Sequence, residues 1–278
     1  MNYLDRNEFN FEPSEKVVEA IKNFDPKTLC FYTRIYDQGK KSVISVRLSE
    51  IYGVPEAQVL LTYGGEDMLK NAIHYYLMNG DNKTILIPEF SWWYYSRVAD
   101  ECGGSYEMYP LHEKEDTFAY NVDEVIERTC SVHPRMLLLA SPNNPTGNSL
   151  TPEEIGKIME NIPSDTMVLV DEAYASFIST DSDDHYRQVA NDMEWGRQLY
   201  KKSLGHLPGF KVYKSVANFI LIKYPIEIKE PLMKALAAED YKIKFMSDKG
   251  LESCLRITLG RKEQTQTVVD TILSIVQP

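Results

Sequence analysis

Polar side chains with distinct chemistry come directly after apolar segments at three places in the chain. The loop Ser141–Gly147 (SPNNPTG) comes directly after the apolar run MLLLA, and its prolines and glycine restrain a backbone that presents two adjacent amides. Asp171 ends another apolar run, VLVD, where a buried carboxylate is costly unless it has a partner such as a protonated ring nitrogen. Arg256, in CLRITLG, could bind a substrate carboxylate through two parallel hydrogen bonds. The structural alternatives are a helix N-cap or salt bridge for Asp171 and an internal ion pair for Arg256.

Two further segments could contact a ligand. Gly64, Gly65 and Glu66 stand between a predicted strand and a predicted helix, where free backbone N–H groups and the helix dipole can hold a phosphate. Such a glycine turn is more often purely structural. The aromatic run WWYY, Trp92 to Tyr95, comes after another strand, and one of its rings could stack on a planar ligand. We expect most of this run to pack in the core or in a dimer contact.

The elements that must position these residues alternate between strands and helices. QVLLTYGGEDMLKNAIHYYL predicts a strand, a glycine turn and a helix, and DNKTILIPEFSWWYYSRVADECGG predicts a second strand and helix. Farther along, RMLLLA and TMVLVD predict strands on either side of a helix that Thr151 and Glu154 begin with a capping box. Alternation of this kind is typical of an α/β fold with a mainly parallel sheet, which binds ligands at the carboxyl ends of its strands.

The pattern changes at the acid-rich stretch STDSDDH. The residues after this stretch predict helices over about 185–204, 228–239 and 263–276, with strands at VANFILIKY and CLRITLG, an order that favours a small α+β domain. We therefore expect an N-terminal arm at 1–30, a large domain at 31–180 and a small C-terminal domain at 181–278.

The composition argues against several classes of protein. A chain of 278 residues, 43% of them hydrophobic, can bury a large core. A formal charge of -11 with no long Lys/Arg run makes nucleic acid an unexpected partner. The four cysteines lack metal-ligand spacing, so we expect no metal and free, mostly buried thiols. No apolar stretch approaches the ~18 residues of a membrane span, and the N-terminus lacks an apolar signal region, so we expect no membrane contact and a cytoplasmic protein.

Taken in order, these segments resemble histidinol-phosphate aminotransferase and its relatives among the class I/II aminotransferases. LDRNEFNFEPSEKV resembles the family's N-terminal arm, YGVPEAQVLLTYGGEDML its phosphate-binding turn, and KVYKSVANFILIK with GLESCLRITLG its small domain. ASPNNPTG followed by VLVDEAYASF is the most specific pair. The resemblance covers nearly the whole chain and implies fold type I with pyridoxal 5'-phosphate (PLP) as cofactor.

Several site roles are implied by this resemblance. Gly65 and Glu66 would lie at the cofactor phosphate, Asn144 and Tyr174 would contact the pyridoxal hydroxyl, and Asp171 would pair with the ring nitrogen and keep it protonated.

The resemblance also implies contacts with the substrate and with a second subunit. Arg256 would bind the α-carboxylate of the amino acid. Tyr36 stands where the family has a tyrosine that reaches the cofactor phosphate of the other subunit, which implies a homodimer with shared active sites. For the ring-stacking aromatic, counting from either side favours Trp93 or Tyr95, and we favour Tyr95.

The chain departs from the family after Phe177. There the family continues through further strands and helices, and one loop carries the Schiff-base lysine, whereas here ISTDSDD leads directly into a helix that resembles the small domain. About 60 residues, at least two strand–helix units, are missing from the pattern, and two buried strands should lose their partners. The catalytic lysine is therefore not identified. Lys202, in KSLGHLPG, imitates the motif, but we expect it to be a decoy because it ends a small-domain helix.

The leading functional hypothesis is a PLP-dependent aminotransferase that moves an amino group between an amino acid and a keto acid or keto phosphate. The alternative is a non-catalytic relative that binds PLP or forms dimers without the lysine. The missing segment has three explanations: an internal segment absent from this sequence, a genuine deletion with a rearranged fold, or a degenerate relative. We favour the first, because both flanks still match the enzyme.

Overall fold

The computed structural model describes residues 1–32, 35–177 and 184–277, and its chain forms two compact units. The main unit comprises Met1–Glu12 and Ala72–Pro278, and the N-terminal helical unit comprises Pro13–Asn71. Residues 178–183, which hold most of the acid-rich stretch expected as a junction, lie outside the described residues. The domain boundaries expected at 30 and 180 stay predictions.

The first part of the main unit is built on a four-stranded parallel sheet with the strand order β3-β2-β6-β7. Its strands are β2 (Thr84–Pro88), β3 (Ser105–Tyr109), β6 (Met136–Ala140) and β7 (Met167–Asp171). Its connecting helices are α4 (Tyr94–Glu101), α5 (Val122–Val132) and α6 (Pro152–Glu160), and the helix before β2 is α3 (Gly65–Met78). The predicted capping box of Thr151 and Glu154 begins α6.

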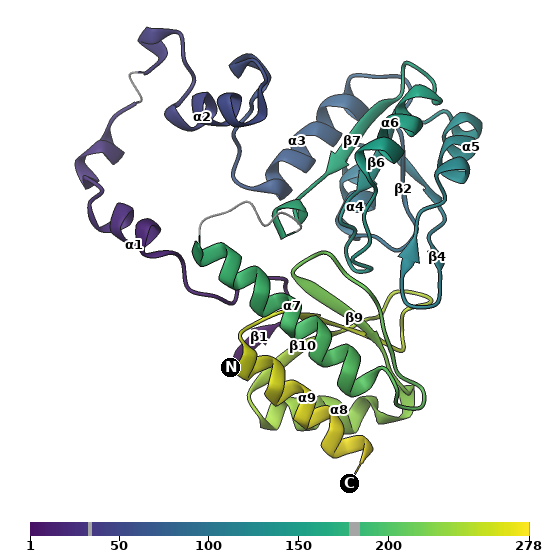
Figure 1. Ribbon diagram of the computed structural model, residues 1–278. Coiled ribbons are helices and arrows are strands. Elements are labelled where there is room, and N and C mark those ends of the chain that lie inside the picture. The colour runs from purple at the N-terminus through teal and green to yellow at the C-terminus, as the bar shows by residue number, and fades with distance from the viewer. Residues whose placement is uncertain (33–34, 178–183, 278) are drawn as a thin grey trace. The chain divides into compact units, whose positions relative to one another are not determined.

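The strand order decides which face each helix covers. The chain steps from β2 outward to β3, and then back past β2 to β6 and on to β7. Because crossovers between parallel strands are right-handed, the reversal places α4 on one face and both α5 and α6 on the other (Figure 1). The α5 and α6 face packs Val125 and Ile158 against Leu137 and Leu139 of β6. The two inner strands, β2 and β6, are apolar on both faces for this reason.

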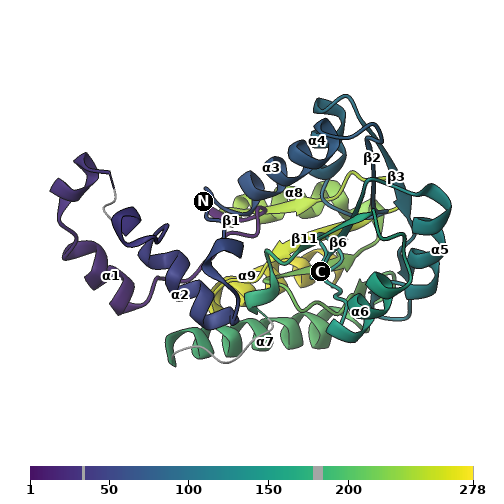
Figure 2. The ribbon, with the colours of Figure 1, turned by 90° about the horizontal axis from the view of Figure 1, so that it is seen from above.

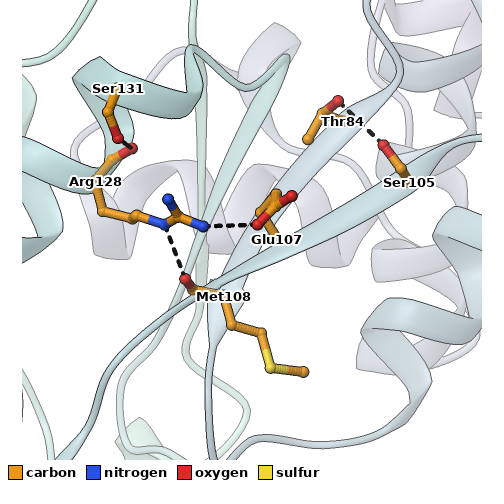
Figure 3. A network of polar contacts seen from close by, with 6 residues as sticks. All are labelled: Thr84, Ser105, Glu107, Met108, Arg128 and Ser131. Carbon is orange, nitrogen blue, oxygen red and sulfur yellow. Dashed lines mark hydrogen bonds and ion pairs between the residues drawn. The ribbon is translucent and has the colours of Figure 1, made fainter.

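The edge strand β3 is held by side chains from its neighbours. Arg128 of α5 reaches back to β3, where it pairs with Glu107 at 2.6 Å and donates to the carbonyl oxygen of Met108 at 3.2 Å (Figure 3). On the β2 side, the hydroxyls of Thr84 and Ser105 lie 3.2 Å apart. The guanidinium therefore satisfies part of an edge that would otherwise be open.

The opposite edge lacks the expected neighbours. β7 pairs with β6 alone among the described residues, and all five of its side chains are partly exposed. The strand predicted before Gly64 does not form, so that prediction was wrong. An apolar segment becomes a strand only when a neighbour satisfies its backbone groups, and the sequence pattern lacks the units that would flank both segments.

The second part of the main unit is a five-stranded mixed sheet with the order β1-β10-β11-β9-β8. Its strands are β1 (Asn2–Leu4), β8 (Lys211–Val212), β9 (Phe219–Lys223), β10 (Tyr241–Phe245) and β11 (Cys254–Thr258). Its helices are α7 (Asp184–Leu204), α8 (Lys229–Ala238) and α9 (Lys262–Val276). Together with the parallel sheet, this mixed sheet confirms the predicted fold class.

The two faces of the mixed sheet pack against different partners. Leu255 and Ile257 of β11 join the core formed with α7, α8 and α9. Cys254 and Leu221 face the other way, toward the hairpin formed by β4 (His112–Glu113) and β5 (Phe118–Ala119). Arg256 of β11 donates to Asn144 in the loop after β6, so β11 lies at the carboxyl end of the parallel sheet, and the two sheets overlap in the view from above (Figure 2). Successive side chains of β11 therefore alternate between the face covered by the helices and the face toward the first part of the unit.

The N-terminal helical unit consists of short helices with little buried apolar surface of its own. It contains α1 (Glu15–Lys22), α2 (Val43–Tyr52), the start of α3 and three 3₁₀ turns, Pro26–Cys30, Ile35–Gln38 and Glu56–Gln58. Gly53 ends α2 in the left-handed region with φ 63°. Leu29 and Tyr63 are 76% and 99% exposed. Polar contacts order the unit internally, such as the 2.6 Å hydrogen bond from the Ser45 hydroxyl to the Glu56 carboxylate. This hydrogen bond and a second one from the Lys41 N–H lower the pKa of Glu56.

Two further expectations concern cysteines and membranes. All four thiols are free, but only Cys102 and Cys254 are buried, while Cys30 and Cys130 are exposed, so the expectation of mostly buried thiols was wrong for half of them. The 3₁₀ turn that holds Cys30 buries none of its residues, and α5 buries Val125 and Thr129 rather than Cys130. Among the described residues, no helix has the length and apolar character needed to cross a bilayer.

Candidate active site

The carboxyl ends of β6 and β7 bring together two of the polar segments found in the sequence. Ala140 of β6 lies opposite Asp171 of β7, and the Ser141 N–H donates to the Asp171 carbonyl oxygen at 3.0 Å. Asp171 therefore projects from the strand end directly beside the loop Ser141–Gly147. Its carboxylate accepts the Ala173 N–H on Oδ1 at 3.0 Å and the Tyr95 hydroxyl on Oδ2 at 2.6 Å.

The two adjacent asparagines of the loop have different roles. Asn143 is fully buried, and its amide nitrogen donates to the Phe90 carbonyl oxygen and to the Thr146 hydroxyl, both at 2.6 Å. Asn143 thus ties the loop to the segment after β2. Asn144 instead accepts from the Arg256 guanidinium on Oδ1 at 2.5 Å, so its NH₂ group is the donor that remains for a ligand.

Arg256 reaches the same place from β11. It lies on the same side of the strand as Cys254 and Thr258, away from the helix-facing Leu255 and Ile257, and is 9% exposed. Besides Asn144, it donates to the Asp5 carbonyl oxygen at 2.7 Å, and the guanidinium lies over the Phe219 ring at 5.6 Å from the centroid.

The electrostatic environment of Arg256 is that of a buried cation. Burial lowers the pKa of Arg256, and electrostatic interactions with Tyr174, Asp5 and Asp248 raise it by less. Its hydrogen bonds go to neutral oxygens, and its Nε is buried without a hydrogen-bond partner among the described residues. A buried guanidinium with an unused donor is suited to bind an anion such as a carboxylate.

The segment after β1 supplies a site residue that sequence reasoning missed. Asn7, with φ 60°, donates from Nδ2 to the Tyr174 hydroxyl at 3.0 Å. Its N–H donates to the Thr258 hydroxyl, and its carbonyl oxygen accepts the Asn218 amide, both at 2.9 Å. The available signal was an asparagine among polar residues after a short apolar run, since asparagine tolerates left-handed backbone. The parallel pairing of β1 with β10 that places it could not be inferred from three residues.

Tyr174 reaches the Phe219 ring that lies beneath Arg256. It stands three residues after Asp171, accepts from Asn7, and packs edge-on against Phe219 with 5.1 Å between ring centroids. Phe219 in turn lies beneath Arg256. Asn144, Arg256 and Tyr174 are thus connected through these contacts, and Asp171 joins the cluster through the Ser141 N–H at the start of the loop that carries Asn144.

The two candidates for ring stacking lie in different surroundings. Tyr95 is 2% exposed, with its hydroxyl on Asp171 and its ring edge-on to Trp92, whereas Trp93 at the start of α4 is 64% exposed. Our preference for Tyr95 as the stacking residue stays a prediction, and of the two rings Trp93 is the one with the larger exposed face.

The segment between Asp171 and Lys201 contains no lysine that could replace the Schiff-base lysine of the family. Lys202 is exposed near the end of α7, on the side of the helix away from Tyr200 and Leu204, which are buried in the mixed-sheet core. This position agrees with its interpretation as a decoy.

The remaining candidates belong to the N-terminal helical unit, and their roles stay predictions. Gly65 is the first residue of α3, and Glu66 lies in its first turn. Gly64, before them, has φ 89°, a conformation that favours glycine, and its carbonyl oxygen accepts the Met68 N–H. Tyr36 is 64% exposed on a 3₁₀ turn.

The fold defines a class. A parallel sheet in one part of the main unit and a mixed sheet in the other form the fold of PLP-dependent transferases of fold type I. A crystal structure of histidinol-phosphate aminotransferase from Sinorhizobium meliloti in complex with pyridoxal-5'-phosphate superposes with a TM-score of 0.83 at 14% identity, covering 99% of this chain and 90% of that one. A decarboxylase from Sulfurospirillum multivorans superposes with a TM-score of 0.79 at 16% identity, covering 100% and 95%.

Sequence comparison narrows the class to a family. The model for aminotransferase class I and II matches residues 2–197, and the chain belongs to this family. Among its relatives, histidinol-phosphate aminotransferase of Natronomonas pharaonis is 23% identical, covering 97% of this chain and 89% of the relative. That of Methanococcoides burtonii is 28% identical, covering 98% and 89%. The first alignment extends over 333 residues, more than the 278 of this chain, so it contains gaps in this chain.

Proposed function

We propose that the protein binds PLP and transfers an amino group between an amino acid and a keto acid or keto phosphate. The observation that carries this proposal is the connected cluster of Asn144, Asp171, Tyr174 and Arg256, with a buried guanidinium nitrogen that has no partner among the described residues. The histidinol-phosphate aminotransferases among its relatives support amino transfer as the reaction.

The donor set of the cluster fits PLP. Asp171 would face the ring nitrogen with a carboxylate that the Ala173 N–H and the Tyr95 hydroxyl already orient. The Asn144 NH₂ and the Tyr174 hydroxyl are the donors suited to the phenolic oxygen. Tyr174 can donate there because it accepts its other hydrogen bond from Asn7. When bound, PLP supplies an electron sink for the bond changes at the substrate α-carbon.

Arg256 and Trp93 complete the proposed binding site. Arg256 would hold the amino-acid carboxylate through its unused Nε, which orients the substrate relative to the ring. Trp93, exposed at the start of α4, would supply the stacking face that the buried Tyr95 does not offer.

The catalytic lysine decides between the two functions that we considered. We propose that the gaps in the alignment fall between Phe177 and α7, where the sequence runs directly into the small-domain pattern. The open edge of β7 supports this location. If the 278-residue polypeptide is the whole protein, the same observation favours the second function, a relative that binds PLP without catalysing transfer.

Absorbance and intact mass separate these functions. The purified protein is incubated with PLP, dialysed, and scanned before and after addition of glutamate. A yellow band that shifts with glutamate, in a protein heavier than 32.0 kDa, is expected for the aminotransferase with its lysine segment. Retained PLP with no response to glutamate, at 32.0 kDa, supports the non-catalytic relative. A protein that retains no PLP contradicts the aminotransferase and the PLP-binding relative, and is the result expected of a relative that only forms dimers.

We also propose a homodimer with shared active sites. The exposed Tyr36 and the exposed apolar residues of the N-terminal helical unit, such as Leu29 and Tyr63, support this proposal because so much apolar surface is unfavourable in water. Analytical ultracentrifugation should give twice the monomer mass. A monomer at micromolar concentration would contradict the proposal.

A further inference from the structure

We propose that Tyr95 is a positioning residue, which holds the Asp171 carboxylate in the orientation needed to meet the cofactor's ring nitrogen. The inference rests on the proposed function and assigns Tyr95 a role different from ring stacking. Its basis is the 2.6 Å hydrogen bond from the Tyr95 hydroxyl to Oδ2 of Asp171.

The surroundings of Tyr95 make this hydrogen bond rigid. Tyr95 is 2% exposed and lies on the inner side of α4 beside the buried Val98 and Ala99, and the Trp92 ring packs edge-on against it at 5.8 Å. A phenol ring has few rotatable bonds, so packing of the ring also places the hydroxyl. Asp171, in contrast, ends an edge strand and is only partly buried. The fixed group is therefore the tyrosine, and the carboxylate is the group that it orients.

The direction of this hydrogen bond is also fixed, with the Tyr95 hydroxyl as the donor. Burial, together with the charge of Asp171 and the hydrogen bond to it, raises the pKa of Tyr95 well above the usual range. The phenol therefore stays protonated and always donates. With Tyr95 on Oδ2 and the Ala173 N–H on Oδ1, both oxygens have a fixed donor, and the remaining lone pairs have defined directions.

A second phenol nearby does not share this role. Burial raises the pKa of Tyr120, and the negative charge of nearby Asp171 raises it further. Its hydroxyl, however, donates to the Ala140 carbonyl oxygen at 2.5 Å. Tyr120→Phe thus removes a phenol oxygen from the same neighbourhood without removing a hydrogen bond to the carboxylate, which makes it a matched control.

The experiment compares two ligands that differ at one ring atom. Pyridoxamine 5'-phosphate binds without a lysine, and its 1-deaza analogue carries carbon in place of the ring nitrogen. Dissociation constants for both are measured by fluorescence quenching with wild-type protein, Y95F and Y120F. We expect wild-type protein to prefer the natural ligand, and Y95F to bind that ligand about tenfold more weakly with little change for the analogue. Y120F should stay within about twofold of wild-type for both.

The ligand preference distinguishes positioning from a structural role. General loosening of the site in Y95F would weaken both ligands equally, and that result, or unchanged binding of both, would overturn the inference. Tyr95→His keeps a ring N–H donor and should retain more of the preference than Y95F, and a thermal melt verifies that each variant is folded. Wild-type protein that binds both ligands equally also contradicts the role. Wild-type protein that binds neither removes the proposed function, and this inference with it, whereas an unchanged Y95F removes the inference alone.

Discussion

Replacement of Arg256 by methionine should destabilise the protein by about 2–4 kcal/mol. Methionine keeps the unbranched apolar stem and removes the charged end of the side chain together with its hydrogen bonds. Two hydrogen bonds are lost, one to Oδ1 of Asn144 at 2.5 Å and one to the Asp5 carbonyl oxygen at 2.7 Å. Each acceptor left without a donor in a buried site costs about 1–3 kcal/mol. Relief from burying the guanidinium, which is 9% exposed, offsets part of this cost.

Arg256→Lys is the matched control for this prediction. Lysine keeps the charge but can reach only one of the two acceptors, and it lacks the planar face that lies over Phe219. We expect a loss of about half that of R256M, roughly 1–2 kcal/mol.

Urea unfolding monitored by circular dichroism gives the free energy of unfolding of each variant from its midpoint and slope. A decrease in the midpoint with an unchanged slope would show lost stability in the native state. R256M within about 0.5 kcal/mol of wild-type protein, or R256K less stable than R256M, would refute the reasoning, because the neutral acceptors would then not depend on the guanidinium.

Three other predictions test single contacts. Asn7→Ala should destabilise the protein more than Asn7→Gly by about 1 kcal/mol in urea unfolding, because both variants lose the bond to Tyr174 but only alanine is strained at φ 60°. Thr151→Ala should cost about 1 kcal/mol in the same assay, and Thr151→Ser much less, because serine keeps the capping oxygen. Burial alone would raise the pKa of Glu113, but hydrogen bonds from Lys211 and Tyr213 outweigh burial and lower this pKa. Glu113→Gln should therefore reduce the melting temperature at about pH 7 and have little effect at about pH 3.

The results that would contradict these three are equally specific. Equal stability of the alanine and glycine variants at position 7 would mean that the backbone there is not left-handed. A serine variant at position 151 as unstable as the alanine variant would exclude the capping bond. For Glu113, a depressed folded-state pKa adds stability above the unfolded pKa, and this stability is lost as the pH falls through the folded pKa. An effect of E113Q that grows at low pH has the wrong sign and would refute the assignment.

Much of the fold could be predicted from local pattern. Apolar runs of strand length between helical segments predicted β2, β6, β7 and β11, because a short apolar run between turns is itself typical of a strand in such a sheet. The capping box of Thr151 and the left-handed glycine after α2 are local in sequence and were equally accessible. The strand predicted before Gly64 shows the limit, since its apolar pattern was suitable but no neighbouring strand pairs with it in the described chain.

The sequence by itself determined which chemical groups the site contains and, for Asn144, Asp171 and Arg256, the strand ends or strand faces that carry them. Only the tertiary structure decided their partners. Tyr95 and Trp93 are two residues apart, yet the packing of α4 buries one against Asp171 and leaves the other exposed. Asn7 reaches Tyr174 only because β1 pairs with a strand more than two hundred residues later. Hydrogen bonds across such separations depend on the packing of whole elements, which residue type and local spacing do not specify.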